Sequence, residues 1–255
     1  MLLCTDVGNT NIKFALYEGD EQLIKLRIST DPGKTEDDFA VELYTIFQIN
    51  GVDAGKIDGS ILSSVVPKIT DSLCKAIKKI TEVDTIVVGP GVKSGLDLRI
   101  DNPLTLGSDI LAMCVAVKEM YSCPAIVIGL GTATTIVYLD ENERYCGGAI
   151  APGVTISLDA LTHHGALLPS TNLKPPKKVI GTNTEDCIRS GVIYGTACMI
   201  DGMIERFNEE RGVKATAFAT GGLASGIVNN CKYDIMINDE LILDGLRLIY
   251  QKNKT

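Results

Sequence analysis

The chain has 255 residues, of which 45% are hydrophobic and 22% are charged, and its formal net charge is −8. This composition is typical of a globular protein with one large core or two moderate ones, and it excludes a long disordered region. We expect no nucleic-acid partner, because phosphate backbones are bound by basic surfaces and the basic residues here are scattered.

The sequence also indicates a compartment. No apolar run reaches the roughly 18 residues that span a bilayer, and the N-terminus lacks the pattern of a signal peptide. The eight cysteines are spread along the chain without a C-x-x-C pair. We therefore expect a cytoplasmic protein without a membrane partner and with reduced, buried thiols, although the cysteine count alone also permits extracellular disulfides.

The first 92 residues predict a mixed sheet with covering helices. An apolar strand meets a sharp turn at Gly8, and apolar residues then alternate along a second strand. Further strands are expected over 23–29, 59–67 and 85–89, and helices over 35–49, starting at Thr35, and 68–80. Strands followed by alternating helices and strands are typical of an α/β domain.

A loop over 93–107 and a helix over about 106–121 lead into a second copy of the opening pattern. An apolar strand over 125–128 meets a Gly-rich turn, and two more strands follow. Aligning Gly8 with Gly131 offsets the copies by 123 residues. We predict a duplicated α/β domain with copies at 1–115 and 116–255, and two unrelated α/β domains remain the alternative.

The second half continues with helices over about 155–163 and 184–211, a strand into Thr220 and a C-terminal amphipathic helix. Apolar residues are spaced along one side of the long helix. This stripe fits a dimer interface and core packing equally well. Its members are Ile188, Val192, Met199 and Met203.

The first turn is a candidate phosphate site. Asp6 ends a buried strand, where an ionised carboxylate needs a metal ion, another cation or hydrogen-bond donors. Gly8 lets the backbone approach a ligand, and the turn amides can point at phosphate oxygens. A Mg²⁺-bound polyphosphate fits this pattern, and a plain hairpin turn with Asp6 as a cap is the alternative. The candidate residues are Asp6, Val7, Gly8, Asn9, Thr10, Asn11 and Lys13.

Two further Gly-rich turns are candidates for the same ligand. Gly131 and Thr132 repeat the first turn, so two hairpins would clamp the phosphates from two sides. Gly221 and Gly222 follow a strand and precede a helix start, an arrangement that brings backbone amides to a nucleotide. Alone, this second pair reads equally as a tight turn.

Paired hairpins with DVGNTN and GTATT, followed by TGG, resemble the acetate kinase, sugar kinase, Hsp70 and actin superfamily. That resemblance implies duplicated ribonuclease H-like (actin-like ATPase) domains. Further segments resemble, in order and spacing, the type III pantothenate kinases. They are GPGVKSGLDLRIDNPLTLGSDI (89–110), GGAIAPG (147–153), GALLP (165–169), GTNTEDCIRSGVIYG (181–195) and TGG (220–222).

This resemblance implies ATP-dependent phosphorylation of pantothenate to 4′-phosphopantothenate, the first step of coenzyme A synthesis, by a homodimer. It implies Mg²⁺ at Asp6, an ATP contact at Thr132 and a pantothenate contact at Thr184 across the dimer interface. The family's Gly-Ala-Asp-Arg motif falls on the substrate-site residues Gly107, Ser108, Asp109 and Ile110. Asp109 takes the place of the catalytic base, and without the resemblance it reads equally as a helix N-cap.

Three departures from the family pattern fall in the same region. Gly129 stands where the family has the aspartate that binds an activating monovalent cation, K⁺ or NH₄⁺. Ile110 replaces an arginine, and Ile100 stands where a substrate-lining tyrosine is common. We expect weak or absent K⁺ activation and weaker binding of the pantothenate carboxylate. A non-catalytic regulatory protein on the same fold and a kinase for another small alcohol are the alternative hypotheses.

Overall fold

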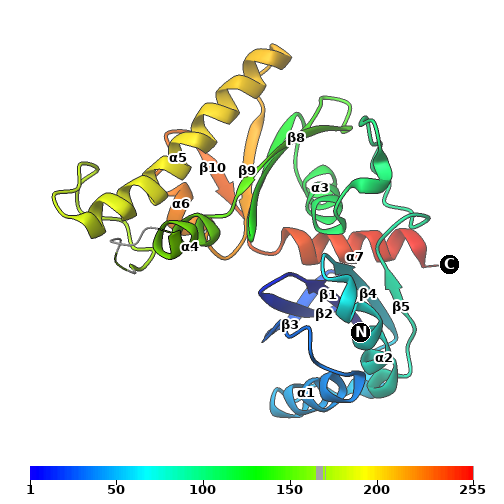
Figure 1. Ribbon diagram of the computed structural model, residues 1–255. Helices are drawn as coiled ribbons and strands as arrows, with labels where there is room; N and C mark the ends of the chain where they lie inside the picture. Colours follow the sequence, from blue (N-terminus) through cyan, green and yellow to red (C-terminus); the bar gives the residue numbers. More distant parts are fainter. Residues whose placement is uncertain (165–168, 170, 255) are drawn as a thin grey trace. The chain divides into compact units, whose positions relative to one another are not determined.

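The computed structural model describes residues 1–164, 169 and 171–254, which form two compact units (Figure 1). The first unit comprises residues 1–95, 102–116 and the chain from Leu241 onward, and the second comprises 96–101 and 117–240. Residues 165–168 of the GALLP segment lie outside the described residues. None of the described helices combines the length and the apolar character that a bilayer-spanning helix needs.

The first unit is built on a five-stranded sheet with the order β3-β2-β1-β4-β5. The strands are β1 (Leu2–Val7), β2 (Asn11–Glu18), β3 (Glu21–Ser29), β4 (Gly59–Ser64) and β5 (Thr85–Val87). β1, β2 and β3 pair antiparallel, whereas β4 runs parallel to β1 and β5 runs parallel to β4. The carboxyl ends of β1 and β4 therefore lie side by side.

Helices α1 (Glu36–Ile49) and α2 (Pro67–Thr81) pack on the first sheet. Thr35 caps α1 as predicted: its hydroxyl accepts from the Asp38 amide, and the Asp38 carboxylate accepts from the Thr35 amide at 2.9 Å. The shared core contains Leu3, Phe14, Phe39, Phe47 and Leu73, all 1% exposed or less. Two 3-10 turns, η1 (Ala54–Lys56) and η2 (Pro103–Thr105), lie in the connections.

Two other helices belong to this unit, α7 (Leu241–Asn253) and the part of α3 (Ser108–Met120) up to Ala116. α7 contacts β1, β2 and β4. It approaches α3 so closely that a Cβ atom on Gly245 would overlap the backbone of Ala112. The predicted boundary at residue 115 assigned the C-terminal helix to the second domain, whereas its contacts place it in the first unit.

The second unit repeats the first sheet. Its strands are β6 (Ala125–Leu130), β7 (Ala133–Leu139), β8 (Tyr145–Pro152), β9 (Thr216–Thr220) and β10 (Ile235–Ile237). Their order is β8-β7-β6-β9-β10, with β7 antiparallel to β6 and β8, and with β9 and β10 parallel to β6. Each strand matches the corresponding strand of the first unit in order and direction, and the predicted duplicated fold is confirmed.

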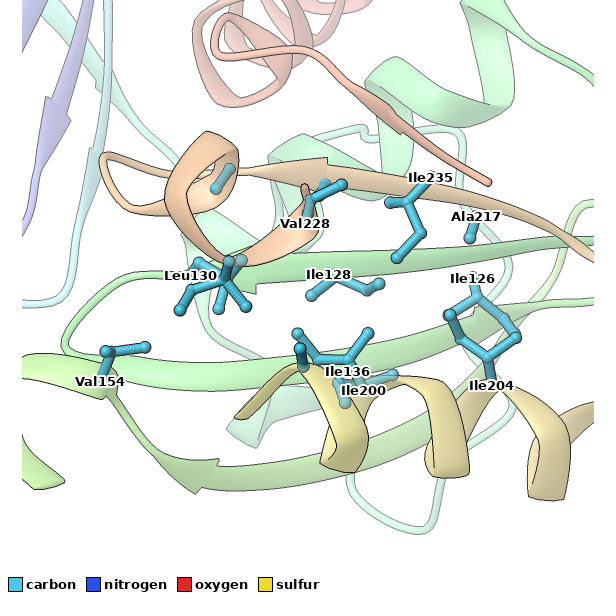
Figure 2. Packing of buried hydrophobic residues seen from close by; sticks show 14 of the residues in the cluster. Ile126, Ile128, Leu130, Ile136, Val154, Ile200, Ile204, Ala217, Val228 and Ile235 are labelled. Carbon is cyan, nitrogen blue, oxygen red and sulfur yellow. The ribbon is translucent and has the colours of Figure 1, made fainter. Parts of the chain in front are cut away.

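The core of the second unit lies between its sheet and helices α4 (Val154–His164), α5 (Thr184–Arg211) and α6 (Ala224–Val228). Figure 2 shows Ile126, Ile128 and Ile136 of the sheet beside Ile200 and Ile204 of α5. The apolar stripe predicted on the long helix belongs to this core. Ile188 and Val192 are buried in it, and Met199 and Met203 pack against it, so the stripe gives no support to a dimer interface.

Candidate functional site

The first Gly-rich turn is held in a fixed shape by backbone hydrogen bonds. The Gly8 amide donates to the Asn11 carbonyl at 3.0 Å, which closes the turn between β1 and β2. From the chain after β3, the Thr30 amide donates to the Thr10 carbonyl at 3.0 Å and the Thr30 hydroxyl donates to the Gly8 carbonyl at 2.6 Å. Asn9 and Thr10 are exposed. The turn is thus rigid and open to a ligand.

Asp6 lies at the start of this turn with its side chain only 7% exposed. It is in register with Lys13 on β2 and with Ser63 on β4. Burial raises the pKa of Asp6 to about 6, with Lys13 lowering it and Asp109 raising it. Within the described part of the chain no hydrogen bond to the Asp6 carboxylate is found. A buried carboxylate without donors favours a bound cation, so Asp6 fits the Mg²⁺ role that the sequence indicated.

Asp109 lies in the first turn of α3, and its side chain is half-buried. The Asp109 Oδ1 atom lies 2.5 Å from the point where a Cβ atom of Gly107 would be. Only glycine therefore fits at position 107 with the Asp109 carboxylate in this orientation. The Asp109 charge contributes, after burial and Lys13, to the pKa of Asp6, so the two carboxylates of the first unit lie within electrostatic range of each other. Ile110 is buried, with 9% exposure.

The second Gly-rich turn is also closed by backbone hydrogen bonds of its own strands, but it is one residue shorter than the first. The Gly131 amide donates to the Ala133 carbonyl at 3.1 Å, and the Gly153 amide donates to the Thr132 carbonyl at 3.1 Å. Gly221, with φ of +115°, packs against Leu130 so closely that a Cβ atom would overlap its backbone. The structure thus brings Gly131, Thr132 and Gly221 together at one end of the second sheet, and Gly222 follows as an exposed residue.

Gly129 occupies the position in the second sheet that Asp6 occupies in the first. It pairs with Thr135 on β7 and with Thr220 on β9, as Asp6 pairs with Lys13 and Ser63. A search over the described residues finds no group of three or more His, Cys, Asp and Glu side chains that could hold a metal ion. The second turn therefore offers backbone groups and hydroxyls but no carboxylate at this position.

The remaining predicted substrate residues lie in the second unit. Thr184 is the exposed first residue of α5, directly after the cap Asn183, whose Oδ1 accepts from the Asp186 amide at 2.9 Å. Ile100 is half-buried and lies beside Gly147. Gly107, Ser108, Asp109 and Ile110 lie in the first unit.

Sequence reasoning missed Thr30, Gly153 and Ser63. Thr30 and Gly153 differ by the same 123 residues as the two aligned turns, so that alignment contained the signal for both. Ser63 was predicted only as part of a buried strand over 59–67, and the pairing of β4 with β1 places it beside Asp6.

Comparison with known proteins shows the family to which the chain belongs. A family model described as type III pantothenate kinase matches residues 2–206. The chain belongs to the type III pantothenate kinase family. The relative from Halalkalibacterium halodurans, a type III pantothenate kinase, is 40% identical over 253 residues, which cover 99% of this chain and 100% of the relative. The Exiguobacterium relative with the same name is 42% identical over 254 residues and covers 100% of both chains.

Solved structures of more distant proteins share the fold. The activator of 2-hydroxyisocaproyl-CoA dehydratase from Clostridium difficile, solved with bound ADPNP, has a TM-score of 0.59 and 15% identity, with 100% of this chain and 98% of that chain covered. Component A of the (R)-2-hydroxyglutaryl-CoA dehydratase from Acidaminococcus fermentans has a TM-score of 0.56 and 14% identity, with 99% of both chains covered. These likenesses support the architecture alone.

Proposed function

We propose that this member of the type III pantothenate kinase family phosphorylates the primary hydroxyl of pantothenate with ATP in the cytoplasm, giving 4′-phosphopantothenate for coenzyme A synthesis. The observation that carries the proposal is the pair of carboxylates in the first unit. Asp6 is buried beside a rigid, open Gly-rich turn, and Asp109 lies close enough to affect its pKa. Phosphoryl transfer to an alcohol needs this combination of phosphate positioning, a cation site and a base.

Each residue of this site has a specific task. The amides of the turn over residues 8–11 bind phosphate oxygens, and Asp6 holds Mg²⁺, which neutralises charge on the polyphosphate when bound. Asp109 accepts the proton of the pantothenate hydroxyl as its oxygen forms the bond to the γ-phosphorus, and ADP leaves. In the second unit, Thr132 and the backbone around Gly131, Gly221 and Gly222 contact ATP.

The departures from the family pattern modify this proposal. Because Gly129 offers no carboxylate, we propose that K⁺ and NH₄⁺ activate the enzyme weakly or not at all. Ile110 is an uncharged side chain that is buried in the first unit, so position 110 supplies no positive charge to bind the pantothenate carboxylate. Ile100 offers an apolar contact to the substrate in place of a phenol. A substrate with weaker anionic character would be favoured by both changes.

We further propose a homodimer in which Thr184 of each subunit completes the pantothenate pocket of the other. Several large apolar side chains of the second unit are exposed, on β8, on α4 and before α5. They are Ile150, Ile156, Leu161, Val179 and Ile180, with exposures from 43% to 83%. Exposed apolar surface of this kind is typical of protein contacts, and Thr184 follows the last two closely in sequence.

The test is an ADP-release assay with purified protein, ATP and Mg²⁺, with and without pantothenate, in Na⁺ and in K⁺. We expect pantothenate-dependent turnover that differs by less than about twofold between the two salts. Asp109→Asn should lower kcat by about 10²- to 10⁴-fold, the usual contribution of a positioned base. Asp71→Asn, which changes an exposed carboxylate on α2, is the matched control and should retain activity.

The outcomes separate the hypotheses. A strong K⁺ requirement would contradict the role given to Gly129. ADP release that does not depend on pantothenate would mean phosphoryl transfer to water and would contradict pantothenate as the acceptor. Absence of turnover in both salts would overturn the pantothenate kinase proposal and favour a kinase for another small alcohol or a regulatory protein.

A further inference from the structure

Hydroxyl groups connect α3 to the carboxyl end of β4, directly beside the two carboxylates. Ser63 is fully buried and is the register partner of Asp6. Ser108, the first residue of α3, is 9% exposed and precedes Asp109 in the chain. Each of the two carboxylates therefore has a buried serine next to it.

The Ser108 hydroxyl makes three contacts with β4. Its oxygen lies 3.0 Å from the Ser63 hydroxyl oxygen, 3.1 Å from the Ser64 amide nitrogen and 3.2 Å from the Ser64 carbonyl oxygen. A hydroxyl has one donor hydrogen and two acceptor lone pairs. All three contacts are satisfied when Ser63 and the Ser64 amide donate to Ser108 and when Ser108 donates to the Ser64 carbonyl. The hydroxyl thus uses its full hydrogen-bonding capacity on one strand end.

The strand end that receives these bonds is itself fixed. The Ser64 hydroxyl accepts from the Val66 amide at 3.1 Å and from the Thr70 hydroxyl at 2.8 Å. The Val65 amide donates to the Val7 carbonyl at 3.0 Å, which ties the same segment to β1. α3 is therefore attached to a part of the first unit that cannot move independently of the strand carrying Asp6.

We propose that Ser108 is a positioning residue, whose hydroxyl fixes the first turn of α3 on β4 and so holds the Asp109 carboxylate at a set place relative to Asp6. Gly107 permits this orientation of the Asp109 side chain, since its missing Cβ leaves room for the carboxylate. The motif that this segment resembles has alanine at position 108, which would lack this hydroxyl. The kinetic consequence of the hydroxyl rests on the proposed kinase function.

The experiment compares four variants with the wild-type protein. Ser108→Ala removes all three contacts, Ser63→Ala removes one donor, and Ser108→Thr keeps the hydroxyl. Ser60→Ala is the matched control, because Ser60 is a fully buried serine of the same strand whose hydroxyl accepts from Thr85 at 3.0 Å. The readouts are kcat and KM for ATP and pantothenate, together with amide hydrogen exchange at Ser64 and over residues 109–111.

We expect Ser108→Ala to lower kcat about tenfold or more with KM for ATP within about twofold, because a displaced base slows proton transfer more than it weakens nucleotide binding. Ser63→Ala should have a smaller effect in the same direction, Ser108→Thr should restore part of kcat, and Ser60→Ala should match the wild type. A kcat for Ser108→Ala within twofold of wild type would overturn the proposal, and so would an equal loss in Ser60→Ala.

Hydrogen exchange separates this proposal from the kinase function. If the wild-type protein shows no turnover, the kinase proposal fails and the exchange data alone decide the bridge. Exchange at Ser64 and over residues 109–111 that becomes tenfold faster in Ser108→Ala, and unchanged in Ser60→Ala, would support it. Unchanged exchange in Ser108→Ala would overturn it.

Discussion

The two hairpin turns of this protein have the same framework and different chemistry. Each follows the central strand of a sheet with the same strand order, and each is held by an amide from the chain after the third strand, Thr30 in one copy and Gly153 in the other. The first turn begins beside a buried carboxylate, Asp6, and the second beside Gly129. The backbone of such a turn is therefore maintained independently of its charge.

The two copies also differ in the space around the residue whose amide holds the turn, which is Thr30 in the first copy and Gly153 in the second. Thr30 adds a hydroxyl bond to the Gly8 carbonyl, so its side chain contributes to the first turn. Gly153 has no such space, since a Cβ atom would overlap the carbonyl oxygen of Thr132. The second turn is packed more tightly against its neighbours, whereas the first relies on a side-chain hydrogen bond.

The largest expected effect concerns the cost of burying Asp6. Its pKa of about 6 lies above the 3.8 of an exposed aspartate, so the folded protein without Mg²⁺ loses stability as pH rises from about 4 to 6. Asp6→Asn removes this titration. The variant should be more stable than wild type by about 3 kcal/mol above pH 6.5 and equally stable near pH 4, while losing Mg²⁺-ATP affinity. Urea unfolding at several pH values measures the difference.

Asp140 in the second unit is the opposing control for Asp6. It is 4% exposed, and burial alone would raise its pKa, but hydrogen bonds from the Arg144 side chain and from the Arg144 and Asn142 amides lower it. Asp140→Asn should therefore destabilise the protein at neutral pH by about 1 to 3 kcal/mol, with the loss fading as pH falls below 4. If Asp6→Asn and Asp140→Asn both stabilised the protein, or if neither did, the predicted difference between the two carboxylates would be contradicted.

Substitutions of Thr30 and Gly153 compare how tightly the two turns are packed. Gly153→Ala should cost about 2 kcal/mol or more, because the new Cβ meets backbone atoms that cannot rotate away, and it should raise KM for ATP. Thr30→Ala should cost only about 1 kcal/mol, the value of one hydrogen bond. Thermal unfolding of both variants measures the order, and a larger loss in Thr30→Ala would show that the first turn is the more constrained.

The smallest expected effect comes from restoring the missing carboxylate. Gly129→Asp places a half-buried charge in the second turn and should lower stability in Na⁺ by about 1 kcal/mol, with recovery in K⁺. Kinase activity of the variant should become dependent on K⁺. Melting temperatures and initial rates in matched NaCl and KCl test this, and salt-independent behaviour would mean that the position cannot bind the ion.

Local signals in the sequence predicted most of the fold. Thr35 with Asp38 marked the start of α1, and the 123-residue repeat predicted two equivalent sheets. Of the candidate site, Asp6 and the Gly-rich turns were readable because a charge and glycines interrupt apolar strands. The contacts of Ser108 and Ser63 were not, because they depend on pairings between segments distant in sequence, and no local pattern encodes them.

The position of α7 has a consequence for how the protein is made. The C-terminal helix packs against the sheet of the first unit. There Tyr17 donates to Asp244 at 3.1 Å, and Arg247 pairs with Asp20. On the ribosome, the N-terminal sheet therefore emerges early but lacks α7 until the residues after 240 have been made, whereas residues 117–240 form a contiguous segment. The sheet synthesised first is therefore completed after the second one, and the unit that holds both carboxylates assembles only once the segment after residue 240 is available.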